Sequence, residues 1–206
     1  MQGLMLGAFI DGVPVKDGKF AGDAFSFFSS FAVASGLGVV AGYALLGATW
    51  LIFKTAGSTQ KYARSAGRWA LLAALTFIGI VSLWTPLTHP AIAERWFSLP
   101  NIAFLWPVPF ATLALAILIW RAIPVPPDGR AFAYSLLLSL LAYAGLGISL
   151  WPYAIPESVT IWQAAGAPDT LIFVGVGTAI ILPLTLAYLA YAHWIFRGKV
   201  EGGYGH

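Results

Sequence analysis

Few side chains in this sequence could bind a metal or a haem. The chain contains no cysteine, which excludes disulfides, thiolate metal sites, haem attached through CxxCH and iron–sulfur clusters. His89 and His193 lie at opposite ends of apolar segments, so most of a bilayer separates them and they cannot share a metal or a haem. Met1 and Met5 lie outside these segments and are poor substitutes as axial ligands. We therefore predict no catalytic residue, no cofactor-binding residue and no metal ligand in this chain.

The charged side chains give the same indication. Ionisable groups within a membrane usually mark proton relays, substrate paths or counter-ions. No charge falls in the middle of any long apolar segment here. We expect a structural role at the membrane interface for His193, which lies beside Tyr191 and Trp194. The residues alone therefore indicate a scaffold rather than a catalyst.

The composition is that of an integral membrane protein. Of the 206 residues, 59% are hydrophobic and only 9% are charged, whereas a soluble domain carries about a quarter charged residues. Because about twenty apolar residues cross the hydrocarbon core, we predict an all-α bundle of five transmembrane helices in a single membrane domain, residues 1–206. The predicted spans are residues 25–53, 69–88, 101–119, 131–150 and 170–196. The apolar run before them is too short to span, and we interpret it as the remnant of a preceding helix.

Residues 36–55, GLGVVAGYALLGATWLIFKT, form the segment with the most small residues. Gly38 and Gly42 make a GxxxG pair, and Gly47 follows. Helices in lipid associate where small side chains let the backbones approach, so we expect this segment to pack on another helix through its glycines. The alternative is a chance match in a glycine-rich chain.

The segments between the spans are predicted to be loops. Residues 11–24 read as a surface loop with a short extended piece, residues 54–68 as a short basic loop, and residues 89–100 as a connector. Pro107 and Pro109 predict an irregular start to the third span, and Pro183 predicts a kink in the fifth.

The distribution of charge predicts an orientation. If the spans alternate, one side of the membrane receives most of the basic residues: Lys54, Lys61, Arg64, Arg68, Arg121, Arg130, Arg197 and Lys199. The other side receives Lys16, Lys19 and Arg95 and most of the acids: Asp11, Asp17, Asp23, Glu94, Glu157 and Asp169. The positive-inside rule places the basic side in the cytoplasm, with the C-terminus, and the loop before the first span outside. This small basic excess does not indicate nucleic-acid binding.

Most of the tryptophans are explained by aromatic belts at the two interfaces. Two spans end in similar sequences, SLWTP at 82–86 and SLWP at 149–152. We expect Trp84, Pro86, Trp151 and Pro152 to pack against other helices or to mark the interface. This similarity between the two spans fits either an old duplication of a helical hairpin or the shared chemistry of the membrane interface.

Several stretches together resemble subunit II of cytochrome bd-type quinol oxidases, in the form of the cyanide-insensitive branch. They are QGLMLGAFIDGV at 2–13, GLGVVAGYALLGATWLIFKT at 36–55, SLWTP at 82–86, RWFSLPN at 95–101, GISLWPYAIPESVTIWQAAGAPDTLIF at 147–173 and YAHWIFRGKV at 191–200. Two details depart from the family pattern. AFSFFSSF, before the first span, lacks the expected proline, and His193 stands where tyrosine is common.

The resemblance implies nine spans, of which this sequence would hold the last five. The missing N-terminal helices would carry the acidic residues linked to proton delivery. A fragment, a misplaced start or a split gene would each produce such a chain.

The resemblance further implies a partner, the haem-bearing subunit I, which carries haem b and haem d and oxidises ubiquinol or menaquinol. The complex reduces dioxygen to water in the bacterial inner membrane and generates a membrane potential. This chain would be its non-haem scaffold, in contact with lipid and, in some members, with a structural quinone or lipid. The alternative interpretation is half of a small membrane transporter or permease, although such sites usually need polar groups near the midplane.

Overall fold

The computed structural model describes residues 1–12, 15–16, 19–20, 25, 28–99, 101–156, 159–196 and 198–199. Five segments of this part are helical and apolar over a length sufficient to cross a membrane, which confirms the all-α membrane class. The helices are α1 Gln2–Asp11, α2 Ser30–Lys54, α3 Gly57–Thr88, α4 Pro90–Phe97, α5 Asn101–Leu105, α6 Pro107–Ala122, α7 Gly129–Leu150, α8 Ile161–Ala164 and α9 Pro168–Ile195.

Two small antiparallel hairpins complete the described structure. β1 Val15–Lys16 pairs with β2 Lys19–Phe20, inside the predicted loop 11–24, much of which lies outside the described residues. β3 Tyr153–Ile155 pairs with β4 Val159–Thr160, between α7 and α8. Several of the charges that predict the orientation also lie outside the described residues or in side chains that are not described: Lys16, Asp17, Lys19, Asp23, Arg95, Glu157 and Arg197.

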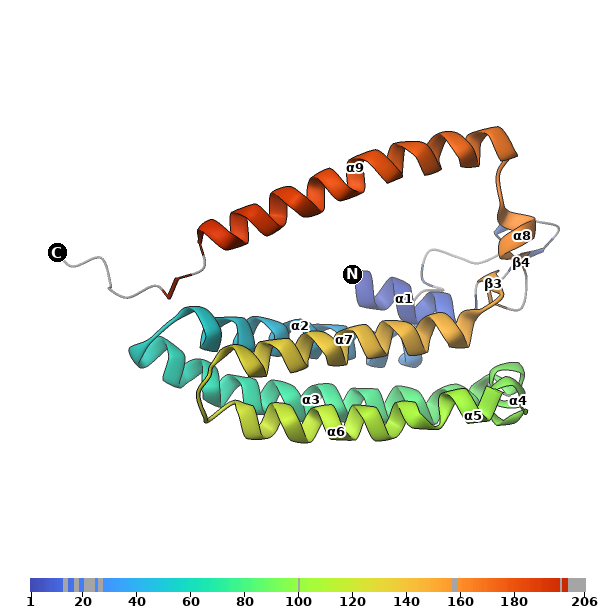
Figure 1. Cartoon of the computed structure of the whole chain (residues 1–206). Helices are drawn as coiled ribbons and strands as arrows, with labels where there is room; N and C mark the ends of the chain where they lie inside the picture. The colour runs from blue at the N-terminus through green and yellow to red at the C-terminus, as the bar shows by residue number, and fades with distance from the viewer. Residues whose placement is uncertain are drawn as a thin grey trace.

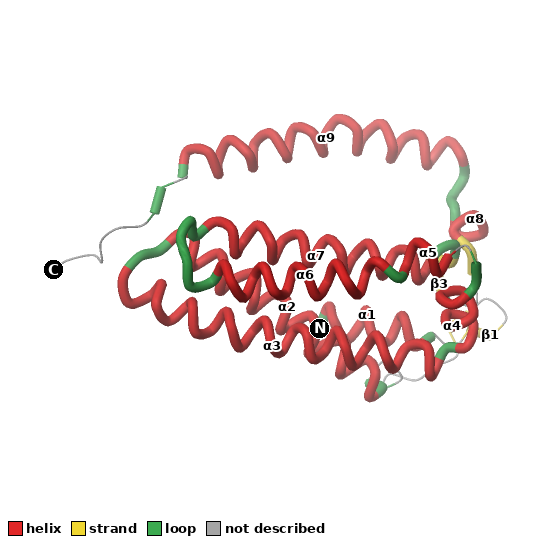
Figure 2. Tube along the Cα trace, turned by 60° about the horizontal axis from the view of Figure 1, so that its bottom comes forward, coloured by secondary structure: helices red, strands yellow, loops and turns green. Residues whose placement is uncertain are grey.

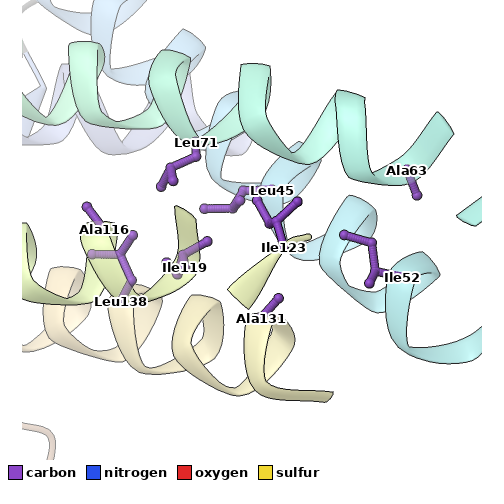
Figure 3. Packing of buried hydrophobic residues seen from close by; sticks show 9 residues of the cluster. All are labelled: Leu45, Ile52, Ala63, Leu71, Ala116, Ile119, Ile123, Ala131 and Leu138. Atoms are coloured by element: carbon purple, nitrogen blue, oxygen red, sulfur yellow. The ribbon is translucent and has the colours of Figure 1, made fainter. Parts of the chain in front are cut away.

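Helices α2, α3, α6 and α7 form an antiparallel four-helix bundle, with α1 packed along α2 (Figure 1). The turns between α2 and α3 and between α6 and α7 lie at the same end of the bundle, here called the basic end, and α4 and α5 lie at the other (Figure 1). A buried cluster joins the four helices near the basic end (Figure 3): Leu45, Ile52, Ala63, Leu71, Ala116, Ile119, Ile123, Ala131 and Leu138. Three alanines in this cluster let the helix backbones approach closely, as expected in lipid.

Several predicted boundaries were wrong. The predicted basic loop 54–68 is helical, because α3 begins at Gly57, twelve residues before the predicted span. Tertiary contacts stabilise this first part of α3, since Ala63 is fully buried against the bundle. The predicted connector 89–100 contains helix α4, with Pro90 in its first turn, where proline is favoured.

The other differences are smaller. α2 begins at Ser30 rather than at residue 25, because the Ser29 hydroxyl caps it by accepting a hydrogen bond from the backbone N–H of Ala32 at 3.0 Å. α7 and α9 each begin two residues earlier than predicted, and α6 ends three residues later. The predicted irregularity in the third span is found, since the helix breaks at Trp106 between α5 and α6. α9 continues through Pro183 as one curved helix (Figure 1).

Helix α9 stands apart from the bundle in both views (Figures 1 and 2). None of the 18 residues in its most apolar window is buried. The chain between α7 and α9, through β3, β4 and α8, connects it to the bundle at one end. Side-chain contacts at the basic end, described below, hold the other.

Helices α1 and α2 approach each other closely at Gly3 and Gly7. A Cβ atom added to Gly7 would lie 2.6 Å from the Cα of Ala32 and 2.7 Å from the Cβ of Ser35. One added to Gly3 would lie 2.8 Å from the Cα of Gly36. Two helix backbones are therefore in direct contact, and no side chain can be inserted between them without moving one helix.

We expect the substitution Gly7→Ala to lower the free energy of unfolding by about 1–3 kcal/mol, the usual cost of overpacking, because the clash is with backbone. Thermal unfolding of the detergent-solubilised chain, followed by tryptophan fluorescence, measures this. Gly79→Ala is the matched control, since a Cβ there meets no atom within 4 Å. Equal melting temperatures for the two variants would contradict the proposed close packing.

Candidate functional site

A cluster of polar side chains surrounds Asp128 at the basic end, where the α6–α7 connection turns back into α7. Asp128 is the residue before α7 and its side chain is 11% exposed. Its Oδ1 accepts a hydrogen bond from Arg64 Nη2 at 2.6 Å. Its Oδ2 accepts from Lys199 Nζ at 2.5 Å and from Gln60 Nε2 at 3.1 Å. Three donors from two distant parts of the chain therefore share one carboxylate.

The same donors bind the ends of two further helices. Arg64 Nη1 donates to the carbonyl oxygen of Ile123 at 2.5 Å, just after α6. Gln60 Nε2 also lies 2.9 Å from the carbonyl oxygen of Ile52, in the last turn of α2. Carbonyls at helix C-termini lack intrahelical partners and carry partial negative charge, so cationic and amide donors suit them. The first turns of α3 thus fasten α2, α6 and α7 together.

The electrostatics of Asp128 follow from its partners. Burial raises the pKa of this carboxyl, but the hydrogen bond from Lys199, the charges of Lys199 and Arg64 and the bond from Gln60 outweigh it. The net pKa of Asp128 is below its usual value, so the group is ionised at neutral pH. Asp128 lies between α6 and α7, outside the membrane-crossing helices. It acts as a fixed anion rather than as a proton carrier.

Helix α9 is held at the basic end by a second group of contacts. Lys54 Nζ donates to the carbonyl oxygen of Phe196 at 2.6 Å, and lies 5.3 Å and 5.2 Å from the ring centroids of Trp50 and Phe53. The Trp50 ring meets the His193 ring edge-on, at 5.8 Å between centroids. With Lys199 on Asp128, these contacts bring the end of α9 to the bundle.

At the opposite end, His89 lies between α3 and α4. Its Nε2 lies 3.6 Å from Asp11 Oδ1 and has no hydrogen-bond partner among the described residues. The Phe31 ring packs edge-on against both His89 and Trp84. The two histidines therefore belong to opposite ends of the molecule, as the sequence predicts.

The His193 side chain contacts its own helix and Trp50. His193 Nδ1 lies 2.8 Å from the carbonyl oxygen of Leu189, in its own helix, and its ring packs on Trp50. A shallow hollow between α5 and α7 contains neither histidine nor methionine; its lining is Asn101, Leu105, Ala144, Gly147, Ile148, Trp151 and Pro152. In the described part of the chain, no three His, Asp or Glu side chains come close enough to share a metal ion.

The residues predicted to pack helices are spread over the molecule. Gly38 faces α3, where an added Cβ would lie 3.2 Å from the Cβ of Phe77. Added Cβ atoms at Gly42 and Gly47 would meet nothing within 4 Å, so a packing role for these two stays a prediction about surfaces outside the chain.

The interface residues divide into two groups. Trp84 and Pro86 lie in the last turns of α3, with Trp84 against Phe31. Trp151 and Pro152 line the hollow beside α5, and Trp151 also meets Trp162 edge-on at 5.6 Å between centroids.

Two features were missed by the sequence reasoning. Gly3 and Gly7 have the same GxxxG spacing as Gly38 and Gly42, so the signal was present in QGLMLG. The Asp128 cluster joins residues 64 to 71 positions apart, and no local pattern pairs them. The only signal was an acid among the basic residues of one side.

The profile of a known family, described as cytochrome bd terminal oxidase subunit II, matches residues 1–196. The chain belongs to this family. Its match covers all nine helices given above, and so it confirms the resemblance that the sequence stretches indicate.

Curated relatives of this family give the same result. The chain is 22% identical, over 232 aligned positions, to the cytochrome bd-I ubiquinol oxidase subunit 2 of Escherichia coli K12. It is equally similar to the proteins of the same name from Escherichia coli O6:H1 and O157:H7. The alignment covers 96% of this chain and 61% of the relative in each case. The chain thus spans less than two thirds of the length of these subunits.

We expect Asp128→Asn to lower the free energy of unfolding by about 1–2 kcal/mol at pH 7, because hydrogen bonds to a charged group weaken and the exposure of Lys199 limits the loss. The pKa of Asp128 is lowered in the folded chain, so its contribution is complete above the unfolded value of about 3.9 and is lost as pH falls through the folded value.

The measurement is the melting temperature of both proteins between pH 7 and pH 3. The gap between them should stay constant down to about pH 5, narrow as pH falls below the unfolded pKa of about 3.9, and close only when pH falls below the lowered folded value. Asp169→Asn, at the exposed first turn of α9, controls for loss of a carboxylate and should cost under about 1 kcal/mol. A gap that does not narrow at all between pH 5 and pH 3 would contradict the role of the ionised carboxylate.

Proposed function

We propose that this chain is part of subunit II of a cytochrome bd-type quinol oxidase and acts as its non-haem scaffold. The observation that carries the proposal is the family match over residues 1–196, which includes the bundle, α9 and the loops between them. The names of the Escherichia coli relatives describe a ubiquinol oxidase subunit. Its partner is the haem-bearing subunit I, in a respiratory complex.

The complex oxidises ubiquinol or menaquinol and reduces dioxygen to water. Haem b and haem d, held by subunit I, supply the electron transfer and the oxygen chemistry. In this proposal, the chain contributes helices that surround subunit I and exclude water from it. The positions of His89 and His193 support this division of roles, because the two side chains lie at opposite ends of the molecule and cannot share one haem.

We propose that the basic end faces the cytoplasm, in the inner membrane of a bacterium. Of the charged side chains that the structure describes, the basic end carries Lys54, Lys61, Arg64, Arg68, Arg121, Arg130, Lys199 and Asp128. The opposite end carries Asp11, Glu94 and Asp169. The positive-inside rule favours this orientation, which also puts the C-terminal end of α9 in the cytoplasm.

Two surfaces of the chain suit contacts with other helices. Helix α9 has no buried residue in its most apolar window, and Gly42 and Gly47 of α2 face open space. Small residues and bare helix faces are what helices in lipid use to associate. We propose that these surfaces meet subunit I and the part of subunit II that the alignment with the relatives leaves unmatched, and that residues 1–206 form one membrane domain with them.

The absorption spectrum of the purified protein tests the proposal. We expect haem b and haem d bands when the tagged chain is isolated in mild detergent with the membrane proteins that accompany it. The lone chain, expressed without them, should show no haem band. A stable lone chain that never recovers a haem protein would favour half of a small transporter instead.

Substitution of either histidine tests the non-haem role. We expect His89→Ala and His193→Ala to leave the haem bands of the isolated complex unchanged in position and in amount per complex, because in this proposal subunit I supplies every haem ligand. Each variant is compared with the unsubstituted complex in the reduced and the oxidised state. A lost or shifted haem band in either variant would refute the assignment of that histidine as structural.

A further inference from the structure

In the part of the chain that the structure describes, the basic end carries more positive charge than its one carboxylate can balance. Among the residues that the structure describes, Asp128 is the only carboxylate at this end, and Arg64 and Lys199 already bind it. The structure shows no carboxylate within salt-bridge distance of the remaining described cations there: Lys54, Lys61, Arg68, Arg121 and Arg130. Such a surplus attracts an anion from outside the described chain.

One of these cations, Arg68, lies over an aromatic ring of the neighbouring helix α6. The guanidinium carbon of Arg68, on α3, lies 5.5 Å from the ring centroid of Trp120, near the end of α6. This contact favours a position of the arginine over the ring, and Arg68 makes no hydrogen bond to the residues that the structure describes, so its N–H groups can donate to an anion. Arg121 follows Trp120 directly, on the exposed side of α6.

The helical spacing adds a third cation to the same edge. Lys61 and Arg68 are seven residues apart on α3, so they lie on one face of that helix. Both side chains are exposed. We name this set, Lys61, Arg68, Trp120 and Arg121, the α3–α6 basic edge.

An apolar surface continues from the basic edge toward the middle of the membrane. Leu72, one turn beyond Arg68 on α3, is 43% exposed. On α6, Ile117 and Leu113 lie one and two turns before Arg121 and are 45% and 59% exposed. On each of the two helices, exposed apolar side chains therefore continue from the cations along one helix face.

We propose that the α3–α6 basic edge binds an anionic phospholipid, with the headgroup phosphate between Arg68 and Arg121 and an acyl chain along Leu72 and Ile117. The charge pattern favours a lipid over a soluble anion, because only an amphiphile satisfies both the cations and the apolar surface. It also favours a lipid over an acidic protein, since the apolar part lies within a helix that crosses the bilayer. Basic groups at a membrane surface each strengthen binding of anionic lipid by about fivefold.

The proposal rests on the orientation given above only in placing this lipid in the cytoplasmic leaflet. Binding itself can be measured in detergent, where neither the orientation nor the oxidase activity enters. The two proposals can thus fail separately.

The experiment is native mass spectrometry of the chain, purified in mild detergent with the partners that it retains, and titrated with phosphatidylglycerol or phosphatidylcholine. We expect a bound phosphatidylglycerol with an affinity several-fold above that of phosphatidylcholine. Arg68→Gln and Arg121→Gln should each reduce this preference by about fivefold. Arg68→Lys should retain more of it than Arg68→Gln, because the charge remains.

Arg130→Gln is the matched control, since it removes one exposed charge from the same end, at the start of α7 and outside the edge. It should leave the preference unchanged, and tryptophan fluorescence should show that every variant melts as the parent does. An equal loss in Arg130→Gln would mean diffuse attraction and would overturn the site. Displacement of the lipid by soluble glycerol phosphate at equal concentration would also overturn the proposal. The same holds if the edge binds no lipid because a partner protein covers it.

Discussion

Contact between small residues holds these helices together, because a lipid environment rewards the burial of large apolar side chains only weakly. Gly3 and Gly7 bring the backbones of α1 and α2 into direct contact, and alanines take the place of larger residues in the cluster that joins α2, α3, α6 and α7. The larger apolar side chains mostly face outward, as α9 shows along its whole length. The packing therefore depends on a few positions where any added atom would separate two helices.

Polar contacts then fix how the packed helices meet at their ends. At the basic end, Asp128 lies outside the membrane-crossing segments, where two cations can approach it without the full cost of burial. Arg64 and Gln60 use their remaining donors on carbonyls at the ends of α6 and α2. The Asp128 cluster therefore links α2, α3, α6, α7 and the segment after α9.

The sequence predicts the features that depend on the membrane environment, and it does not predict the contacts between residues that are distant in the chain. Apolar length gives the five spans, and Pro107 gives the break at Trp106, because both are local effects of the solvent and of the backbone. The helix over residues 57–68 was missed because its polar composition is that of a loop, and only contacts of Ala63 and Arg64 with distant helices stabilise it. No local pattern pairs Asp128 with residues more than 60 positions away.

Helix α9 shows that the formation of a helix in lipid and its position relative to the bundle depend on different interactions. A helix satisfies its own backbone in lipid, so α9 needs no neighbour in order to be helical. Its position is another matter, since no buried residue in its apolar window holds it to the bundle. The position depends on the chain through β3, β4 and α8 at one end, and on Lys54, His193 and Lys199 at the other. Because these ties leave the middle of α9 bare on every side, that surface can receive other helices without breaking any contact of the described chain.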